Sequence, residues 1–138
     1  MKIDISDLKQ LNDFAKTFSA NLSKGDVVFL EGDLGSGKTT FTQLLLKHLT
    51  YQGRVKSPTY AIYESYDLPQ FSLIHMDLYR LSSPEELYYL AIEEIFAPNN
   101  VVIIEWPDKG KGVLPKSNKT LCFELINSHK RQLNVDIT

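Results

Sequence analysis

A run of glycines that ends in a lysine and a hydroxyl residue carries the most evident chemistry in this sequence. The stretch reads Gly32-Asp33-Leu34-Gly35-Ser36-Gly37-Lys38-Thr39 and matches the phosphate-binding pattern of Gly, four residues, Gly-Lys, and Ser or Thr. Glycines let several backbone N–H groups approach one anion, because they tolerate unusual dihedral angles and carry no side chain. The pattern therefore predicts a site for a nucleoside triphosphate.

The residue types of this loop suit a triphosphate and its metal ion. We expect Lys38 to place positive charge between the β- and γ-phosphates, and the Thr39 hydroxyl to ligate Mg²⁺. The positive end of the following helix would also face the phosphates. An ordinary glycine turn before a helix is the alternative. The expected nucleotide-binding residues are Gly32, Gly35, Ser36, Gly37, Lys38, Thr39 and Thr40.

Two carboxylates each follow an apolar segment that reads as a strand. Asp77 follows residues 71–76, and Glu105 follows residues 101–104. Open α/β sheets bind ligands beyond the carboxyl ends of their strands, so both side chains are candidates for a site. A carboxylate in that position can hold Mg²⁺ directly or through water. We expect this of Glu105, while Arg80 either pairs with Asp77 or contacts phosphate.

Of three further features, Trp106 and the Ser57–Thr59 loop keep two interpretations each, while His75 keeps one. Trp106 directly follows Glu105, and its indole could shield the metal site from solvent or act as an aromatic plug on the surface. Pro58 fixes an extended loop that exposes Ser57 and Thr59, which could sense a γ-phosphate or merely lead to a strand. His75 is expected to be packed or hydrogen-bonded, since no His and Cys cluster has zinc spacing.

Hydrophobic periodicity indicates the elements that would position these residues. Apolar residues at spacings of three and four predict an amphipathic helix over 6–22, and a second helix follows the glycine loop over 40–49. The predicted strands cover 27–30, 61–66, 71–76, 101–105, 120–126 and 131–137. The sequence thus predicts a three-layer α/β domain of the P-loop NTPase-like class, with a mixed, mainly parallel central sheet and a C-terminal hairpin.

Composition limits the class of protein further. The 138 residues are 43% hydrophobic and 23% charged, which predicts one soluble domain over 1–138. The formal charge of -2 argues against a surface that neutralises many phosphates, so any link to nucleic acid should be indirect. A single cysteine excludes an internal disulfide, and the sequence contains neither a signal-peptide pattern nor a membrane-length apolar run. We expect a cytoplasmic location.

Five motifs in order resemble one family. They are Gly-Asp-Leu-Gly-Ser-Gly-Lys-Thr-Thr at 32–40, Lys-Ser-Pro-Thr-Tyr at 56–60, His-Met-Asp-Leu-Tyr-Arg-Leu at 75–81, Pro-Glu-Glu-Leu at 84–87 and Ile-Glu-Trp-Pro at 104–107. The sequence resembles the bacterial tRNA threonylcarbamoyladenosine biosynthesis ATPases, the TsaE (YjeE) family, nearly from end to end. One mild departure is Ser36, which stands where alanine is commoner.

The resemblance implies a slow ATPase that uses ATP and Mg²⁺ and acts with the partner proteins TsaB and TsaD. Those partners would attach the threonylcarbamoyl group to adenosine beside the anticodon of tRNAs that read codons beginning with A, so the tRNA contact of this chain would be indirect. The implied catalytic residues are Lys38, Asp77, Thr59 and Trp106. Thr39 and Glu105 would bind Mg²⁺, and Ser57 would share a switch-like loop with Thr59.

Two other classes of protein use the same glycine loop. A small-molecule kinase would need a lid with phosphate-clamping arginines, and the chain contains only Arg54, Arg80 and Arg131. A GTPase-type switch reads its base with Asn-Lys-x-Asp. The single Asn-Lys of this chain, Asn118-Lys119, continues with Thr120-Leu121 instead. We therefore retain the kinase as the alternative.

Overall fold

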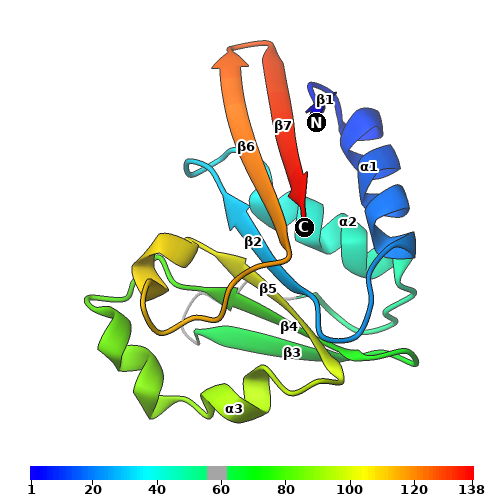
Figure 1. The fold of residues 1–138 in the computed structure, drawn as a ribbon. Helices are drawn as coiled ribbons and strands as arrows, with labels where there is room; N and C mark the ends of the chain where they lie inside the picture. Colours follow the sequence, from blue (N-terminus) through cyan, green and yellow to red (C-terminus); the bar gives the residue numbers. More distant parts are fainter. Residues whose placement is uncertain (56–61) are drawn as a thin grey trace.

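A computed structural model describes residues 1–55 and 62–138, and within these residues one twisted sheet runs through the molecule (Figure 1). Its strands lie in the order β1-β7-β6-β2-β5-β4-β3. Their bounds are β1 Lys2–Asp4, β2 Val27–Glu31, β3 Tyr63–Asp67, β4 Ser72–Asp77, β5 Asn100–Glu105, β6 Lys119–Asn127 and β7 Lys130–Ile137. The predicted loop with Ser57 and Thr59 lies outside the described residues.

The sheet is parallel at its centre and antiparallel at its edges. Strand β2 pairs in parallel with both β5 and β6, and β4 pairs in parallel with β5. The hairpins β3–β4 and β6–β7 and the short edge strand β1 are antiparallel. The predicted mixed α/β sheet and C-terminal hairpin are confirmed. The parallel part of the sheet comprises the four central strands β6, β2, β5 and β4. Because these strands run in parallel, their carboxyl ends lie along one edge.

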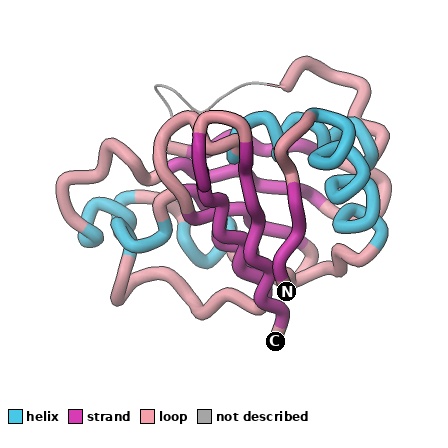
Figure 2. The backbone as a smooth tube through the Cα atoms, turned by 90° about the horizontal axis from the view of Figure 1, so that it is seen from above, coloured by secondary structure: helices cyan, strands magenta, loops and turns pink. Residues whose placement is uncertain are grey.

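Two apolar clusters, one on each face of the sheet, make the fold three-layered. Strand β5 shows this most simply, because Val101 and Ile103 pack in one cluster and Val102 and Ile104 in the other. Successive strand residues point to opposite faces, so both faces of this strand are buried. The helices α1 (Leu8–Ala20) and α2 (Lys38–His48) cover the first face, while η1 (Pro84–Tyr89) and α3 (Ile92–Ile95) cover the second (Figure 2).

The helices largely follow the predicted pattern. Their bounds are α1 Leu8–Ala20, α2 Lys38–His48, α3 Ile92–Ile95, and the 3₁₀ helices η1 Pro84–Tyr89 and η2 Pro107–Gly110. Helix α1 begins after Asp7, which accepts a hydrogen bond from the Gln10 amide at 2.7 Å. Ser83, Pro84 and the acidic residues after them predict a helix that starts at Ser83 and runs to about Ala91. Its start is confirmed, because Ser83 caps η1, but the helix is of the 3₁₀ type and ends at Tyr89. The segment forms η1 and then extends at Leu90, and its single buried side chain, Leu87, does not give an α-helix an apolar face to pack.

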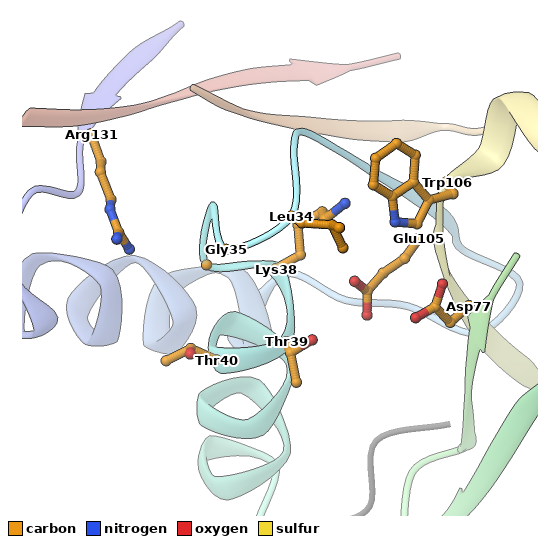
Figure 3. Close-up of a pocket in the computed structure, with 10 residues that line it drawn as sticks. Leu34, Gly35, Lys38, Thr39, Thr40, Asp77, Glu105, Trp106 and Arg131 are labelled. Atoms are coloured by element: carbon orange, nitrogen blue, oxygen red, sulfur yellow. The ribbon is translucent and has the colours of Figure 1, made fainter. Parts of the chain in front are cut away.

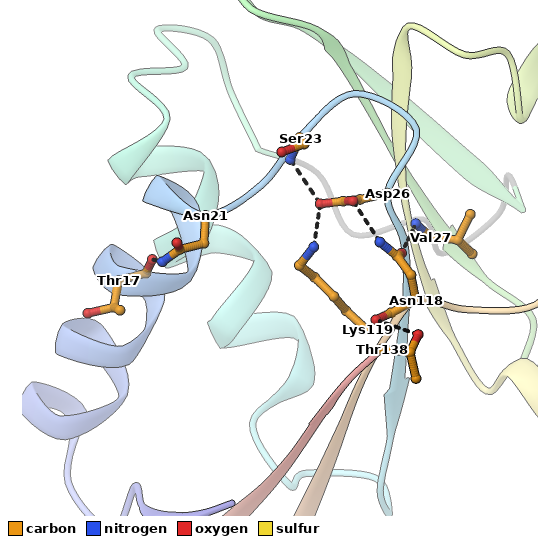
Figure 4. Close-up of polar contacts among 8 residues, drawn as sticks. All are labelled: Thr17, Asn21, Ser23, Asp26, Val27, Asn118, Lys119 and Thr138. Atoms are coloured by element: carbon orange, nitrogen blue, oxygen red, sulfur yellow. Dashed lines mark hydrogen bonds and ion pairs between the residues drawn. The ribbon is translucent and has the colours of Figure 1, made fainter.

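A buried polar network fixes β2 against β6 at the end of the sheet away from the glycine loop (Figure 4). Lys119 Nζ and Asn118 Nδ2 donate to the Asp26 carboxylate at 2.7 and 2.8 Å, and the Ser23 amide donates at 2.9 Å. Asn118 also accepts from the Val27 amide at 2.8 Å. The Asn-Lys dipeptide therefore has a structural place in this fold, away from the loop that would bind a nucleotide.

Among the described residues, no helix is long and apolar enough to cross a membrane.

Candidate functional site

The glycine loop joins β2 to α2 at the carboxyl edge of the sheet, as the sequence predicted. Gly37 is the N-cap of α2 and has a left-handed φ of 111°, which turns the chain sharply into the helix. Gly32 has a φ of 140°, and a Cβ placed on it would lie 2.6 Å from the Phe123 carbonyl oxygen. Glycine is therefore required at position 32 both by backbone conformation and by the close approach of β6.

A cavity of about 340 Å³ opens beside this loop (Figure 3). The residues that line it are Leu34, Gly35, Gly37, Lys38, Thr39, Thr40, Asp77, Glu105, Trp106 and Arg131. Most of the predicted site residues thus meet at one place, although they come from distant parts of the sequence. Gly32 and Ser36 do not line this cavity and instead face a second one, of about 390 Å³, between the loop and β6.

Lys38 is buried and lies in the middle of the cavity wall. Its ammonium donates a hydrogen bond to the Gly32 carbonyl oxygen at 2.5 Å and sits 4.0 Å from the centre of the Trp106 ring. Burial lowers the pKa of Lys38, while the charges of Glu105 and Asp77 oppose that shift. The Lys38 charge is thus held by a carbonyl oxygen and an aromatic face, contacts that phosphate oxygens can replace.

Asp77 and Glu105 lie side by side because β4 and β5 end in register. The two residues are direct partners in the parallel ladder, and the Leu78 amide donates to the Glu105 carbonyl oxygen at 3.1 Å. Burial raises the pKa of Asp77. The Tyr79 amide, which donates to Asp77 Oδ1 at 3.0 Å, opposes that shift, and the charge of Glu105 adds to it. The cavity therefore contains two neighbouring carboxylates.

Glu105 is the more buried of the two and pairs with His75. His75 Nε2 lies 2.6 Å from Glu105 Oε2, and the residues are 1% and 3% exposed. The expectation that His75 is packed and hydrogen-bonded is confirmed. Its partner could not be identified from the sequence, because that required the register of β4 against β5.

Trp106 lies in the cavity wall with an unusual backbone conformation. Its φ and ψ of 57° and 52° are left-handed, which is rare for a residue other than glycine and costs of order 1–3 kcal/mol. The ring contacts Tyr79 at 5.1 Å between centroids and faces the Lys38 ammonium. The structure therefore places the indole beside the loop lysine, within the cavity, as the shielding interpretation requires.

The donor set is suited to Mg²⁺. Figure 3 shows the carboxylates of Glu105 and Asp77 together, with Thr39 across from them at the start of α2. Hydroxyl and carboxylate oxygens are the ligands that this hard cation prefers. Within residues 1–55 and 62–138, no three His, Cys, Asp or Glu side chains form a metal cage. Mg²⁺ does not need one, since it is commonly held by one or two carboxylates together with substrate phosphates.

Sequence reasoning missed Arg131 as a site residue. It belongs to β7, yet it lines the same cavity as Thr40, on the side away from Asp77 (Figure 3). Its backbone is held by the N-terminal segment, because the Ile5 amide donates to its carbonyl oxygen at 3.1 Å and its own amide donates to Ser6 Oγ at 3.0 Å. No local motif marks it, since the hairpin alone brings it to the cavity. Arg80, by contrast, does not line this cavity.

Comparison with known proteins identifies the family. The family model described as threonylcarbamoyl adenosine biosynthesis protein TsaE matches residues 5–133. A relative from Haemophilus influenzae, named tRNA threonylcarbamoyladenosine biosynthesis protein TsaE, is 43% identical over 110 residues, which cover 76% of this chain and 70% of the relative. Proteins of the same name from Borreliella burgdorferi and Bacillus subtilis are 35% and 34% identical, over 93% and 86% of this chain and 94% and 74% of their own lengths.

A solved structure has the same fold. The crystal structure of Bacillus subtilis YdiB superposes with a TM-score of 0.80 at 27% sequence identity, covering 100% of this chain and 86% of the other. The match includes the sheet that brings the glycine loop and the two carboxylates together. Given the family model over nearly its whole length and relatives of up to 43% identity, the chain belongs to the TsaE family.

Proposed function

We propose that this chain is a Mg²⁺-dependent ATPase of low intrinsic activity that serves threonylcarbamoyladenosine modification of tRNA. One observation carries the proposal. The loop residues Lys38 and Thr39 face the carboxylates Asp77 and Glu105 in a single cavity of about 340 Å³. The names of the relatives, which refer to tRNA threonylcarbamoyladenosine biosynthesis, support the biological role. The modified tRNAs would be those that read codons beginning with A.

We infer a direction for the nucleotide from the residues that line the cavity. The loop amides and the N-terminus of α2 take the α- and β-phosphates, because such N–H groups point at bound anions. The γ-phosphate then lies toward Lys38, Asp77 and Glu105. The nucleoside end lies toward Thr40 and Arg131 on the opposite side. A lysine between the β- and γ-phosphates stabilises the negative charge that develops during phosphoryl transfer.

The two carboxylates would have different roles in nucleotide binding and hydrolysis. Thr39 and Glu105 would hold Mg²⁺, which neutralises charge on the β- and γ-phosphate oxygens when bound. Asp77 is the more exposed carboxylate at the open end of the strand pair, where its oxygens can accept a hydrogen bond from the attacking water. Trp106 covers this end of the cavity and limits the access of bulk water. Glu105 thus serves binding, and Asp77 serves hydrolysis.

The partners in this proposal are TsaB and TsaD, which would make the main contact with tRNA. The formal charge of -2 supports this division, because affinity for nucleic acid depends on clustered Lys and Arg. Hydrolysis by this chain would then couple to the partners' reaction, and the slow intrinsic rate would rise in their presence.

The test compares nucleotides and partners on the purified chain. We expect binding of ATP with Mg²⁺ in preference to GTP, co-elution with TsaB and TsaD when ATP is present, and faster ATP hydrolysis in that mixture. Asp77→Asn should keep Mg²⁺-dependent binding and lose turnover, whereas Glu105→Gln should weaken the binding itself. Phosphate transfer to a small metabolite without partners would favour the kinase alternative, and equal binding of GTP would contradict the ATP assignment.

A further inference from the structure

The pair formed by His75 and Glu105 is buried in the interior of the sheet, directly behind the cavity. The two side chains are 2% and 4% exposed, and the His75 Nε2 to Glu105 Oε2 distance is 2.6 Å. Strands β4 and β5 are covered on both faces by apolar clusters, so bulk water does not reach this contact. A polar pair in such a place needs a reason, because two packed apolar side chains would cost less to bury.

In the register of β4 and β5, His75 lies two residues before Asp77 and so farther inside the sheet than the two carboxylates. Asp77 faces Glu105 across the ladder, while His75 faces Ile103. Residues two apart share a face of the sheet, so His75, Asp77 and Glu105 all point to the side covered by α2. Glu105 therefore turns one oxygen inward to His75. This contact also holds the Glu105 carboxylate beside the like charge of Asp77, which would otherwise repel it.

The hydrogen bonding indicates which atom carries the proton. Within the described part of the chain, His75 Nδ1 is buried and has no hydrogen-bond partner. A proton on Nδ1 would leave a buried donor unsatisfied, so a ring protonated on Nε2 alone suits the site best. In this form Nε2 donates to Oε2 without cancelling the carboxylate charge. No described residue donates to Glu105 Oε1, and Glu105 lines the nucleotide cavity.

We infer that His75 is a positioning residue, which locks Glu105 by one oxygen so that the other faces the nucleotide and its Mg²⁺. This inference rests on the proposed function. Partners behind a metal ligand fix the ligand's orientation, and losing one typically costs about 10–100-fold in metal affinity or activity. The pair would thus set the Mg²⁺ concentration that nucleotide binding requires, although His75 itself would touch neither the nucleotide nor the ion.

The experiment titrates Mg²⁺ against a fluorescent ATP analogue bound to the full chain. We expect His75→Leu to raise the Mg²⁺ concentration for half-maximal binding by about 10–100-fold. Binding of the analogue without Mg²⁺ should stay unchanged. His75→Gln keeps an N–H donor, so it should recover part of the loss and provides a second variant if His75→Leu does not fold. Met76→Ala, a buried change on the opposite face of β4, controls for general destabilisation and should leave the Mg²⁺ dependence unaltered.

A double variant tests whether His75 acts through Glu105. Glu105→Gln should raise the Mg²⁺ requirement, and adding His75→Leu to it should change little further, because the two act as one unit. If Glu105→Gln weakens Mg²⁺-dependent binding while His75→Leu behaves like Met76→Ala, the inference is overturned and the proposed function stands. A wild-type chain with no Mg²⁺-dependent nucleotide binding would overturn the proposed function and the inference together.

Discussion

Gly32 offers a quantitative test of how the loop is built. In Gly32→Ala, the new Cβ would lie 2.6 Å from the Phe123 carbonyl oxygen and 2.9 Å from Ser36 Oγ. Overpacking of this kind costs about 1–3 kcal/mol, and a φ of 140° adds about 1–3 kcal/mol for a residue other than glycine. The sum of about 2–6 kcal/mol is a large share of the roughly 5–15 kcal/mol that stabilises a domain.

The assay is thermal unfolding followed by circular dichroism, with Gly112→Ala as the matched control. Gly112 has a φ of 92° but no atom within 4 Å of its Cβ position, so only the backbone cost of about 1–2 kcal/mol remains. At roughly 4 °C per kcal/mol, the control should lose about 4–8 °C in Tm and Gly32→Ala roughly 8–24 °C. Equal losses in the two variants would refute the claim that β6 restricts position 32.

Three other predictions concern the cavity and the buried network. Arg131→Ala should weaken the affinity for ATP and for ADP by a similar factor of about 10, because in the proposed orientation Arg131 would face the part of the nucleotide that both share. Lys130→Ala, which lies outside the cavity wall, should leave both affinities unchanged, and calorimetry measures them. The Lys38 ammonium lies 4.0 Å from the ring centre of Trp106, the single tryptophan, so fluorescence emission should change when ATP draws this ammonium away. An emission spectrum that is unchanged at saturating ATP would indicate that the nucleotide binds elsewhere. Burial alone would raise the pKa of Asp26, but its hydrogen bonds lower the pKa overall. The ionised Asp26 carboxylate therefore stabilises the fold above about pH 4, and this stabilisation decreases as the pH falls below that value. Asp26→Asn should therefore lower the free energy of unfolding by roughly 3 kcal/mol at pH 7. The difference in unfolding free energy from wild type should shrink in acid, and a difference that stays the same at every pH in urea titrations would contradict this.

Local chemistry explains which parts of the site could be predicted from the sequence. The glycine loop has its own spacing, and Asp77 and Glu105 each close an apolar segment, so their place at the strand ends followed from general rules for parallel sheets. Their position side by side, however, depends on the register of β4 against β5, which no short motif encodes. The partner of His75 depends on the same register.

The features that sequence reasoning missed lack a local signal. Strand β1 has three residues and is stabilised by pairing with β7, so periodicity could not detect it. Arg131 reaches the cavity because a long hairpin folds back beside the loop. The segment after Ser83 has a helix-start pattern, but it buries only Leu87 in η1 and therefore forms a 3₁₀ helix. In each case, tertiary packing decided what local propensity could not.

The proposal that this cavity binds ATP with Mg²⁺ is tested most directly by calorimetric titration of ATP and Mg²⁺ into wild type, Lys38→Ala and Lys47→Ala. Both lysines belong to α2, but Lys38 is 4% exposed in the cavity wall, whereas Lys47 is exposed in the last turn. We expect Lys47→Ala to bind like wild type and Lys38→Ala to bind at least about 100-fold more weakly, since the β- and γ-phosphate charge would lose its buried cation. A folded Lys38→Ala that binds ATP and Mg²⁺ with wild-type affinity would contradict the proposal.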